Sequence, residues 1–181
     1  MNMNTPPTLE TERLKLRPFT EDDSAELVPL IGTREVAATT LRIPHPYTEN
    51  EARDFLAKIH DDDEVRFAIT LRNGGHLCGG IGLRLAPEHQ NAELGYWLGV
   101  PYWGHGYATE AGREVLRYGF EELGLHRIFA SHFKHNPASG RVLVKVGMRY
   151  EGCQREHLRK WDRFVDSELY GILRQEWEHR E

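Results

Sequence analysis

The sequence predicts an α+β fold, with one mixed, mostly antiparallel sheet and a central βαβ crossover. Three observations predict it. Three short apolar runs follow one another in the middle of the chain, and the first two are separated by the turn sequence RNGGH. A helix with a continuous apolar stripe comes next and leads into another strand pattern. Two further strand patterns close the chain.

The first sixty residues predict one strand and two helices. Arg13–Phe19 (RLKLRPF) alternates polar and apolar residues, which is typical of a strand. Glu21–Gly32 has acidic residues in its first turn and a glycine at its end, which is typical of a helix. A second helix is expected over Asn50–His60, before the acidic break at Asp61–Asp63.

The apolar runs in the middle of the chain predict an antiparallel meander. They lie at Val65–Leu71, Leu77–Leu83 and Ala92–Leu98, and each has the length of a strand. Two adjacent glycines inside RNGGH favour a hairpin between the first two runs.

The helix after the meander predicts the crossover. It is expected over Thr109–Leu123, stops at Gly124 and is followed by a strand at Arg127–Phe133. Strands joined through a helix in this way are expected to be parallel, with a right-handed connection. The apolar stripe that packs this helix on the sheet consists of Ala108, Ala111, Val115, Leu116, Phe120 and Leu123.

The last part of the chain predicts a second short helix and two closing strands. The helix is expected over Asn136–Gly147, and the strands near Met148–Leu158 and Arg163–Leu173. The chain contains no repeat, low-complexity tract or internal linker. We therefore expect a single domain over residues 9–181, preceded by a flexible N-terminus at residues 1–8.

Composition and charge exclude several classes of function. The 23 basic and 28 acidic residues give a net charge of −5, so no broad nucleic-acid-binding surface is expected. There is no apolar run of about 18 residues, and the polar start lacks the hydrophobic region of a signal peptide. We expect a cytoplasmic protein with no membrane partner. Cys78 and Cys153 match no zinc or disulfide framework.

The ten histidines raise the question of a metal site, above all His132 and His135. His132 lies in a strand pattern, and no carboxylate or thiol cluster completes a ligand set. No metal is therefore expected.

The loop before the crossover helix, PYWGHGYATEA, is the most informative segment of the chain. A helix start leaves about four backbone N–H groups without partners, and no Ser, Thr, Asp or Asn stands between Trp103 and Ala108 to cap them. In one interpretation, Gly104 and Gly106 let an anion approach these groups, which suits a phosphate. In the other, the glycines only make a tight turn and Thr109 caps the helix. The third glycine of a Rossmann fingerprint and the Lys-Ser/Thr of a P-loop are both missing.

Three motifs in order carry a resemblance to the GNAT N-acetyltransferase superfamily, and specifically to the branch of ribosomal-protein N-terminal acetyltransferases. They are LETERLKLRPF, AELGYWLGVPYWGHGYATEA and NPASGRVLVKVGMRYEG, and together they span nearly the whole chain. The family's pyrophosphate loop, Gln/Arg-x-x-Gly-x-Gly/Ala, falls on residues 103–108 and departs from the pattern at Trp103.

The resemblance implies a GNAT-like fold that binds acetyl-CoA between two splayed parallel strands, without a metal. The pantetheine arm would pair with backbone near Leu98 and Val100. His105 either adds a donor to a phosphate oxygen or is exposed to solvent. The other residues expected at the cofactor are Gly104, Gly106, Tyr107, Ala108, Thr109 and Asn136.

Glu93 and Ser139 are the expected catalytic residues. Strand alternation puts Glu93 on the same face as Gly95 and Trp97, where a carboxylate among apolar residues suits removal of a proton through water. The alternative is an exposed or ion-paired glutamate. The resemblance places Ser139 near the thioester sulfur, as the acid for the leaving thiolate, with Tyr107 as a substitute.

Asn136 also has a purely structural explanation. An asparagine followed by proline is a common helix start, with Asn as the N-cap and Pro at the first helical position. We therefore expect the Asn136 side chain to cap the second short helix.

The acceptor is expected to be a primary amine. The family branch favours a protein or peptide N-terminal α-amine; the alternatives are a small amine such as a polyamine or antibiotic, or a CoA-binding module without catalysis. Two segments could line its entry, Thr39–Tyr47 and His157–Asp166. Asp166 either pairs with the incoming ammonium or is an ordinary surface carboxylate. A monomer or a homodimer is expected.

Overall fold

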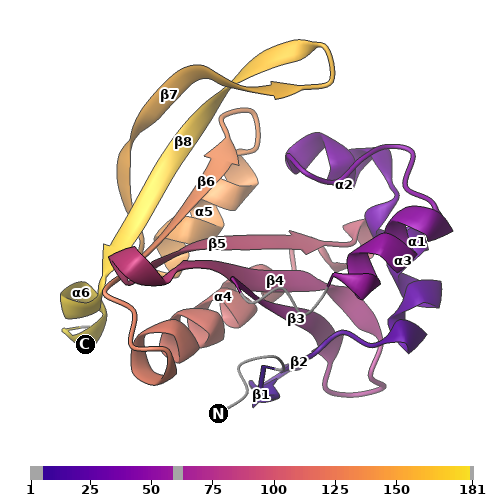
Figure 1. Cartoon of the computed structure of the whole chain (residues 1–181), viewed down its shortest axis with the longest axis horizontal. Helices are drawn as coiled ribbons and strands as arrows, with labels where there is room; N and C mark the ends of the chain where they lie inside the picture. Colours follow the sequence, from indigo (N-terminus) through magenta and orange to yellow (C-terminus); the bar gives the residue numbers. More distant parts are fainter. Residues whose placement is uncertain (1–5, 59–62, 180–181) are drawn as a thin grey trace.

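A computed structural model describes residues 6–58 and 63–179 and contains one eight-stranded sheet (Figure 1). The order across the sheet is β1-β2-β3-β4-β5-β6-β8-β7, and every neighbouring pair is antiparallel except β5 and β6. The predicted α+β fold class, with a mixed and mostly antiparallel sheet, is confirmed. The strands are β1 (Leu9–Glu10), β2 (Leu14–Arg17), β3 (Glu64–Leu71), β4 (Leu77–Ala86), β5 (Asn91–Leu98), β6 (Arg127–Phe133), β7 (Arg149–Lys160) and β8 (Arg163–Leu173).

The helices cover both faces of the sheet (Figure 1). One face packs against α4 and α5, and the other packs against α1, α2 and α3. A short helix, α6, ends the described chain. Their bounds are α1 (Ser24–Ile31), α2 (Arg34–Thr39), α3 (Glu49–Ala57), α4 (Tyr107–Arg117), α5 (Pro137–Lys145) and α6 (Arg174–Glu178).

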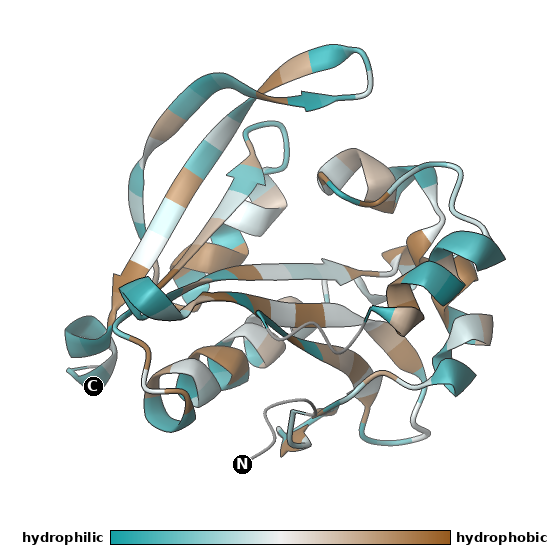
Figure 2. Ribbon diagram, viewed as in Figure 1, coloured by the Kyte–Doolittle hydropathy of each residue, from teal (hydrophilic) through white to brown (hydrophobic). Residues whose placement is uncertain are grey.

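Strand alternation sorts the core into two clusters. In β3, Phe67 and Ile69 join the cluster under α4, whereas Ala68 between them joins the cluster under α1 and α3. In β5, Leu94 and Leu98 face α4, and Trp97 faces the opposite side. Figure 2 shows the same division: hydrophobic residues gather where helices face the sheet, and mostly hydrophilic residues follow β7. The two faces of β5 therefore open onto different surroundings.

The crossover has the predicted parallel strands, but β5 and β6 stay paired over only a short stretch. The register is Asn91 with Arg127, Ala92 with Ile128 and Glu93 with Phe129. Beyond that point β5 continues beside β4, and β6 continues beside β8. The facing edges of residues 94–98 and 130–133 are left unpaired, which produces the expected splayed strands.

The crossover helix differs from the prediction at both ends. It begins at Tyr107 instead of Thr109, and its last turn, Tyr118–Glu122, is a π-helix in which the N–H of Leu123 donates to the carbonyl of Tyr118 at 3.1 Å. Gly119 packs so closely on β6 that a Cβ there would lie 2.6 Å from Ile128 Cδ1. The predicted stop at Gly124 is confirmed, with φ +71°.

The prediction missed β1, α2 and α6. For α2 a signal was present, because Thr33 Oγ1 accepts from the N–H of Val36 at 3.4 Å and Glu35 lies in the first turn. The second predicted helix reaches only Ala57, and residues 59–62 lie outside the described part. Most of the expected flexible N-terminus does as well. In the described ranges, no helix is long and apolar enough to cross a membrane.

Candidate active site

The loop before α4 presents backbone donors at the edge of the split. Gly104 and Gly106 have φ of +78° and +82°, a region that side chains with a Cβ rarely adopt. Gly106 is the N-cap of α4, and no side chain caps it. Within the described chain, no backbone N–H from Gly104 to Thr109 has a hydrogen-bond acceptor. The interpretation in which Thr109 caps the helix is wrong, because Thr109 lies inside the first turn of α4.

This arrangement is suited to an anion. The unpaired N–H groups and the positive end of the α4 dipole point the same way, and glycine leaves room for a ligand to approach the backbone. The side chains of Ala108 and Thr109 are buried, so these two residues offer the loop only their main chain.

Arg13 and Glu110 hold the loop from behind, and the sequence analysis identified neither. Arg13 donates from Nη1 to the carbonyl of His105 at 3.0 Å and from Nε to Glu110 at 2.7 Å. Thr11 Oγ1 also donates to Glu110, at 2.6 Å. Burial raises the pKa of Glu110, but the hydrogen bonds from Thr11 and Arg13 outweigh it and hold the pKa below its usual value.

Two aromatic side chains of the loop have structural partners. The indole Nε1 of Trp103, which replaces the family's Gln or Arg, donates to the carbonyl of Leu98 at 2.8 Å. The ring of Tyr107 stacks on His105, with ring centroids 5.5 Å apart, and lies under the Arg13 guanidinium. Tyr107 forms no hydrogen bond with Ser139, although both residues are described. The His105 ring is exposed.

The end of β5 provides the backbone expected for an extended arm. The N–H of Val100 has no acceptor in residues 6–58 and 63–179, and the residue is 36% exposed. The carbonyl of Leu98 already accepts from Trp103, so it has one remaining lone pair to offer.

Ser139 meets a side chain that the sequence did not single out. Its Oγ lies 2.7 Å from the hydroxyl of Tyr96, on the α4 and α5 side of the split. Burial raises the pKa of Tyr96 to about 12, and the hydrogen bond with Ser139 opposes this rise. The phenol therefore stays protonated at neutral pH and can donate to Ser139.

Asn136 occupies the N-cap position of α5, but its side chain forms no capping hydrogen bond. Only its carbonyl takes part, by accepting from the N–H of Ser139 at 3.1 Å. The expected side-chain cap is therefore wrong, because φ −113° and ψ 68° turn Asn136 out of capping geometry. The side-chain amide of Asn136 has no hydrogen-bond partner among the described residues.

Glu93 lies on the opposite face of β5, in charged surroundings. Its side chain is 37% exposed, and Oε2 lies 3.9 Å from Arg42 Nη2 and 4.0 Å from Arg84 Nη1. The expectation of mostly apolar neighbours is wrong, because α2 and the loop after it bring Arg42 to this face. Neither arginine hydrogen-bonds to Glu93, so the carboxylate remains accessible to water.

The two segments expected at the acceptor entry do meet. Lys160, next to the turn of the β7–β8 hairpin, donates from Nζ to the carbonyls of Ile43 and Leu41, at 2.9 and 3.4 Å. Asp166 accepts from Lys134 Nζ at 3.2 Å and from the N–H of Glu156 at 2.9 Å, so its carboxylate is already engaged.

The two histidines considered for metal binding have different partners. The His132 side chain is buried beside Glu168, 3.5 Å from Nε2 to Oε2, and His135 Nε2 lies 3.1 Å from the carbonyl of Ala38. In the part of the chain that the structure describes, no three His, Cys, Asp or Glu side chains gather in a group able to hold a metal.

The protein-family model of the acetyltransferase (GNAT) domain matches residues 13–149 of this sequence. The chain belongs to the GNAT acetyltransferase family. The uncharacterized N-acetyltransferase YoaA of Bacillus subtilis (strain 168) is 33% identical over 173 residues, covering 93% of this chain and 97% of YoaA. YdaF of the same organism, provisionally named a ribosomal N-acetyltransferase, is 36% identical over 105 residues, covering 58% of this chain and 57% of YdaF. The protein is thus an acetyl-transferring enzyme.

Solved structures agree with the family. A GNAT acetyltransferase from Bacillus anthracis superposes with a TM-score of 0.85 at 29% identity, covering 93% of this chain and 99% of that chain. A spermidine N-acetyltransferase from Vibrio cholerae, solved with CoA and spermine, superposes with a TM-score of 0.82 at 24% identity, covering 93% of this chain and 100% of that chain. The second likeness concerns the fold alone.

The anion site predicts the effect of a substitution at Gly106. We expect Gly106→Val to weaken CoA binding at least tenfold, because a branched side chain at φ +82° strains the turn that aims the backbone N–H groups, and its Cβ would lie 3.5 Å from Arg13 Nη2, which holds the loop. Calorimetry on the folded variant measures it. Gly75→Val is the matched control, since φ is +69° there and a Cβ would meet nothing within 4 Å. Unchanged affinity in Gly106→Val would rule out the phosphate loop.

Proposed function

We propose that the enzyme transfers an acetyl group from acetyl-CoA to the α-amine at the N-terminus of a peptide or protein, by direct attack in a ternary complex. The observation that carries the proposal is the split between β5 and β6. Ser139 and Tyr96 lie on its α4 and α5 side, and Glu93 lies on its other side. Two substrates can therefore approach one point from opposite faces.

The residues at the split fit acetyl-CoA as the donor. Unpartnered N–H groups from Gly104 to Thr109 suit its pyrophosphate, and the free N–H of Val100 suits an amide of its pantetheine arm. The unpaired Asn136 amide lies at the start of α5, next to Ser139 in the same turn. Acetyl-CoA supplies the acetyl thioester; the chain supplies binding, orientation and proton transfer.

Proton transfer in the reaction divides between the two faces. The amine nitrogen forms a bond to the acetyl carbon, the carbon–sulfur bond breaks, and the thiolate takes the bonding electrons. Glu93 accepts the amine proton through water, because its carboxylate is exposed and has no direct hydrogen bond. Ser139 passes a proton to the thiolate and takes one from Tyr96, whose phenol is protonated at neutral pH, and water then returns a proton to Tyr96.

A peptide α-amine is favoured over a polyamine by the charges near Glu93. Arg42 has a side chain that is 60% exposed, and the buried Lys160 has no carboxylate partner among the described residues. Two such cations oppose a polycationic acceptor. The provisional name of YdaF supports the same choice.

A thiol-release assay across an acceptor panel tests the function. We expect peptides with a free α-amine to exceed spermidine at least tenfold in kcat/KM, and the same peptides blocked at the N-terminus to be inactive. A preference for spermidine, or for a lysine side chain in the blocked peptides, would contradict the proposed acceptor.

Glu93→Gln tests the base. We expect kcat to fall by roughly 10²-fold or more, with acetyl-CoA affinity nearly unchanged, because the amide cannot accept the proton. Glu88→Gln is the control, since Glu88 is exposed on the turn before β5. Turnover close to that of the control would make Glu93 a structural residue.

Ser139→Ala and Tyr96→Phe separate the two hydroxyl groups. If Ser139 donates to the thiolate, Ser139→Ala should slow single-turnover chemistry by about 10²-fold, whereas Tyr96→Phe removes only the supporting donor and should slow it less. Thermal melts show whether both variants are folded. A larger defect in Tyr96→Phe than in Ser139→Ala would assign the proton donor to Tyr96.

A further inference from the structure

Arg42 lies beside Glu93, on the side of the split where the proposed acceptor enters. We call this side the acceptor face and the α4 and α5 side the donor face. The guanidinium of Arg42 donates no hydrogen bond to another described residue. It lies 3.8 Å from Glu64 and 3.9 Å from Glu93, and the side chain is 60% exposed. A guanidinium has donors in a planar fork, which matches the two oxygens of a carboxylate.

The carboxylates near Arg42 already have other partners. Glu64 accepts from Arg84 Nε at 2.6 Å and from Arg66 Nε at 2.6 Å. Arg84 also lies near Glu93. In this set of ion pairs among described residues, three arginines thus share two carboxylates, which leaves one positive charge in excess.

Lys160 adds a second uncompensated cation behind the same loop. The residue is 7% exposed, its Nζ donates to the carbonyls of Leu41 and Ile43 and lies 5.4 Å from the centroid of the Trp161 ring, and no carboxylate within the described chain pairs with it. Those two carbonyls flank Arg42 in sequence, so Lys160 fixes the backbone that carries Arg42. These cations thus lie in a chain whose net charge is −5, opposite in sign to theirs.

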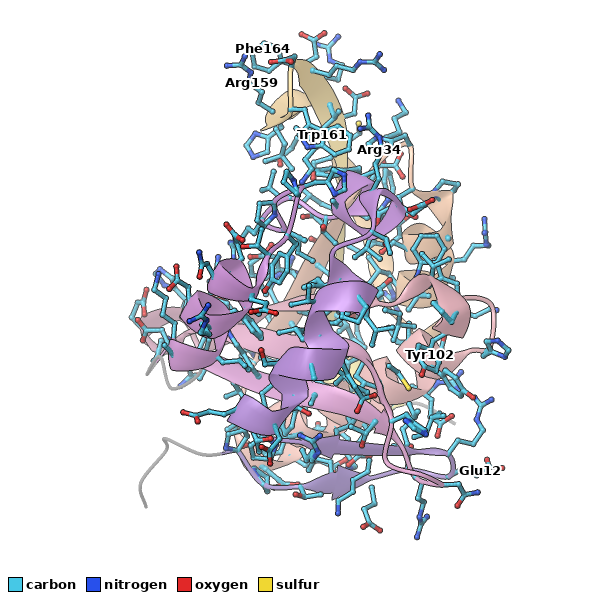
Figure 3. All side chains as sticks on the ribbon, turned by 90° about the vertical axis from the view of Figure 1, so that its right-hand side faces the viewer. Glu12, Arg34, Tyr102, Arg159, Trp161 and Phe164 are labelled. Carbon is cyan, nitrogen blue, oxygen red and sulfur yellow. The ribbon has the colours of Figure 1, made fainter. Side chains whose placement is uncertain are left out.

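The hairpin and α2 add cationic and aromatic side chains near the same opening. Arg34 of α2 lies over the ring of Trp161 at 4.9 Å, and Arg159, which pairs with Asp162 at 3.7 Å, lies over Phe164 at 6.0 Å. Figure 3 shows Arg34 beside Trp161, which lies in the turn of the hairpin, and places Arg159 and Phe164 above them, where the two residues are paired across β7 and β8. An acceptor that enters past these side chains meets exposed guanidinium groups and aromatic rings.

We propose that Arg42 is a specificity-determining residue that binds a carboxylate of the acceptor, close to the amine that receives the acetyl group. This inference rests on the proposed function, and the acceptor class is then a peptide with Asp or Glu near its N-terminus. The cation attracts an acidic segment and repels a basic one.

Distances place the acidic residue near the second or third position. If Glu93 takes the proton through one water, the amine lies about 5–6 Å from its carboxylate, the length of two hydrogen bonds. The guanidinium of Arg42 lies 3.9 Å from that carboxylate. The amine and Arg42 are then within about 10 Å, the span of two to three extended residues.

The experiment compares peptides that differ by a single isosteric change. Four peptides share an N-terminal residue and an amidated C-terminus, and carry Glu or Gln at position two or three. We expect wild-type kcat/KM for Glu to exceed that for Gln at least tenfold at one position, because a charge-assisted hydrogen bond is lost in Gln. The preference should decrease as salt is raised.

Arg42→Gln should remove this preference and leave the Gln peptides acetylated. Arg42→Lys should retain part of it, since the charge remains and the fork is lost. The matched control is Arg149→Gln, whose side chain is 75% exposed and pairs with Glu176, on the last described helix; it should keep the wild-type ratio. The ratio of Glu to Gln is decisive, because a merely structural effect of Arg42 would reduce both rates alike.

An equal Glu to Gln ratio in Arg42→Gln and wild type would overturn the inference, as would a wild-type preference for Gln. If peptides are acetylated without any such preference, only the inference fails. If only small amines are acetylated, the peptide assignment fails instead. In that case, kcat/KM for an amino acid and for its amide, measured in wild type and in Arg42→Gln, decides whether Arg42 binds a carboxylate.

Discussion

Hydrogen bonding between β5 and β6 ends after the pair Glu93 and Phe129, and both faces of the candidate site depend on this end. A sheet that closed fully would pair the backbone of residues 94–98 and 130–133 and leave no opening between them. Because β5 stays hydrogen-bonded to β4, and β6 to β8, each strand keeps one paired edge and exposes the other. The exposed edges carry the unsatisfied backbone groups that a ligand can use.

Hydrogen bonds between distant parts of the chain surround the split. On the acceptor face, Lys160 of the hairpin binds the loop after α2, and His135 contacts the carbonyl of Ala38. On the donor face, Arg13 of the first hairpin binds both Glu110 and the carbonyl of His105. These contacts join segments about a hundred residues apart in sequence, such as Arg13 and Glu110, separated by 97 positions. The geometry of the split is thus a tertiary property, although its edges are local strands.

Sequence patterns predicted the elements well where periodicity was strong, and these hydrogen bonds poorly. The strands at Val65–Leu71 and Arg127–Phe133 have the predicted extent to within one residue, because alternation and turn residues mark their ends. The π-helical last turn of the crossover helix was not predictable, since no residue pattern marks it and the close packing of Gly119 on Ile128 is a tertiary contact. Tyr96 resembled an ordinary core residue in a strand, and only the approach of α5 pairs it with Ser139.

The two faces of the split use different kinds of groups, and this affects how specificity can change. The donor face offers backbone N–H groups from Gly104 to Thr109, whose positions depend on φ values that glycine alone adopts readily. Side-chain substitutions on the acceptor face leave such donors in place. The acceptor face offers Arg42 and the hairpin side chains, which a single substitution can replace without moving the sheet. A loop that carries the acceptor contacts can therefore diverge while the donor site stays constant, because the site on each face is built from separate atoms.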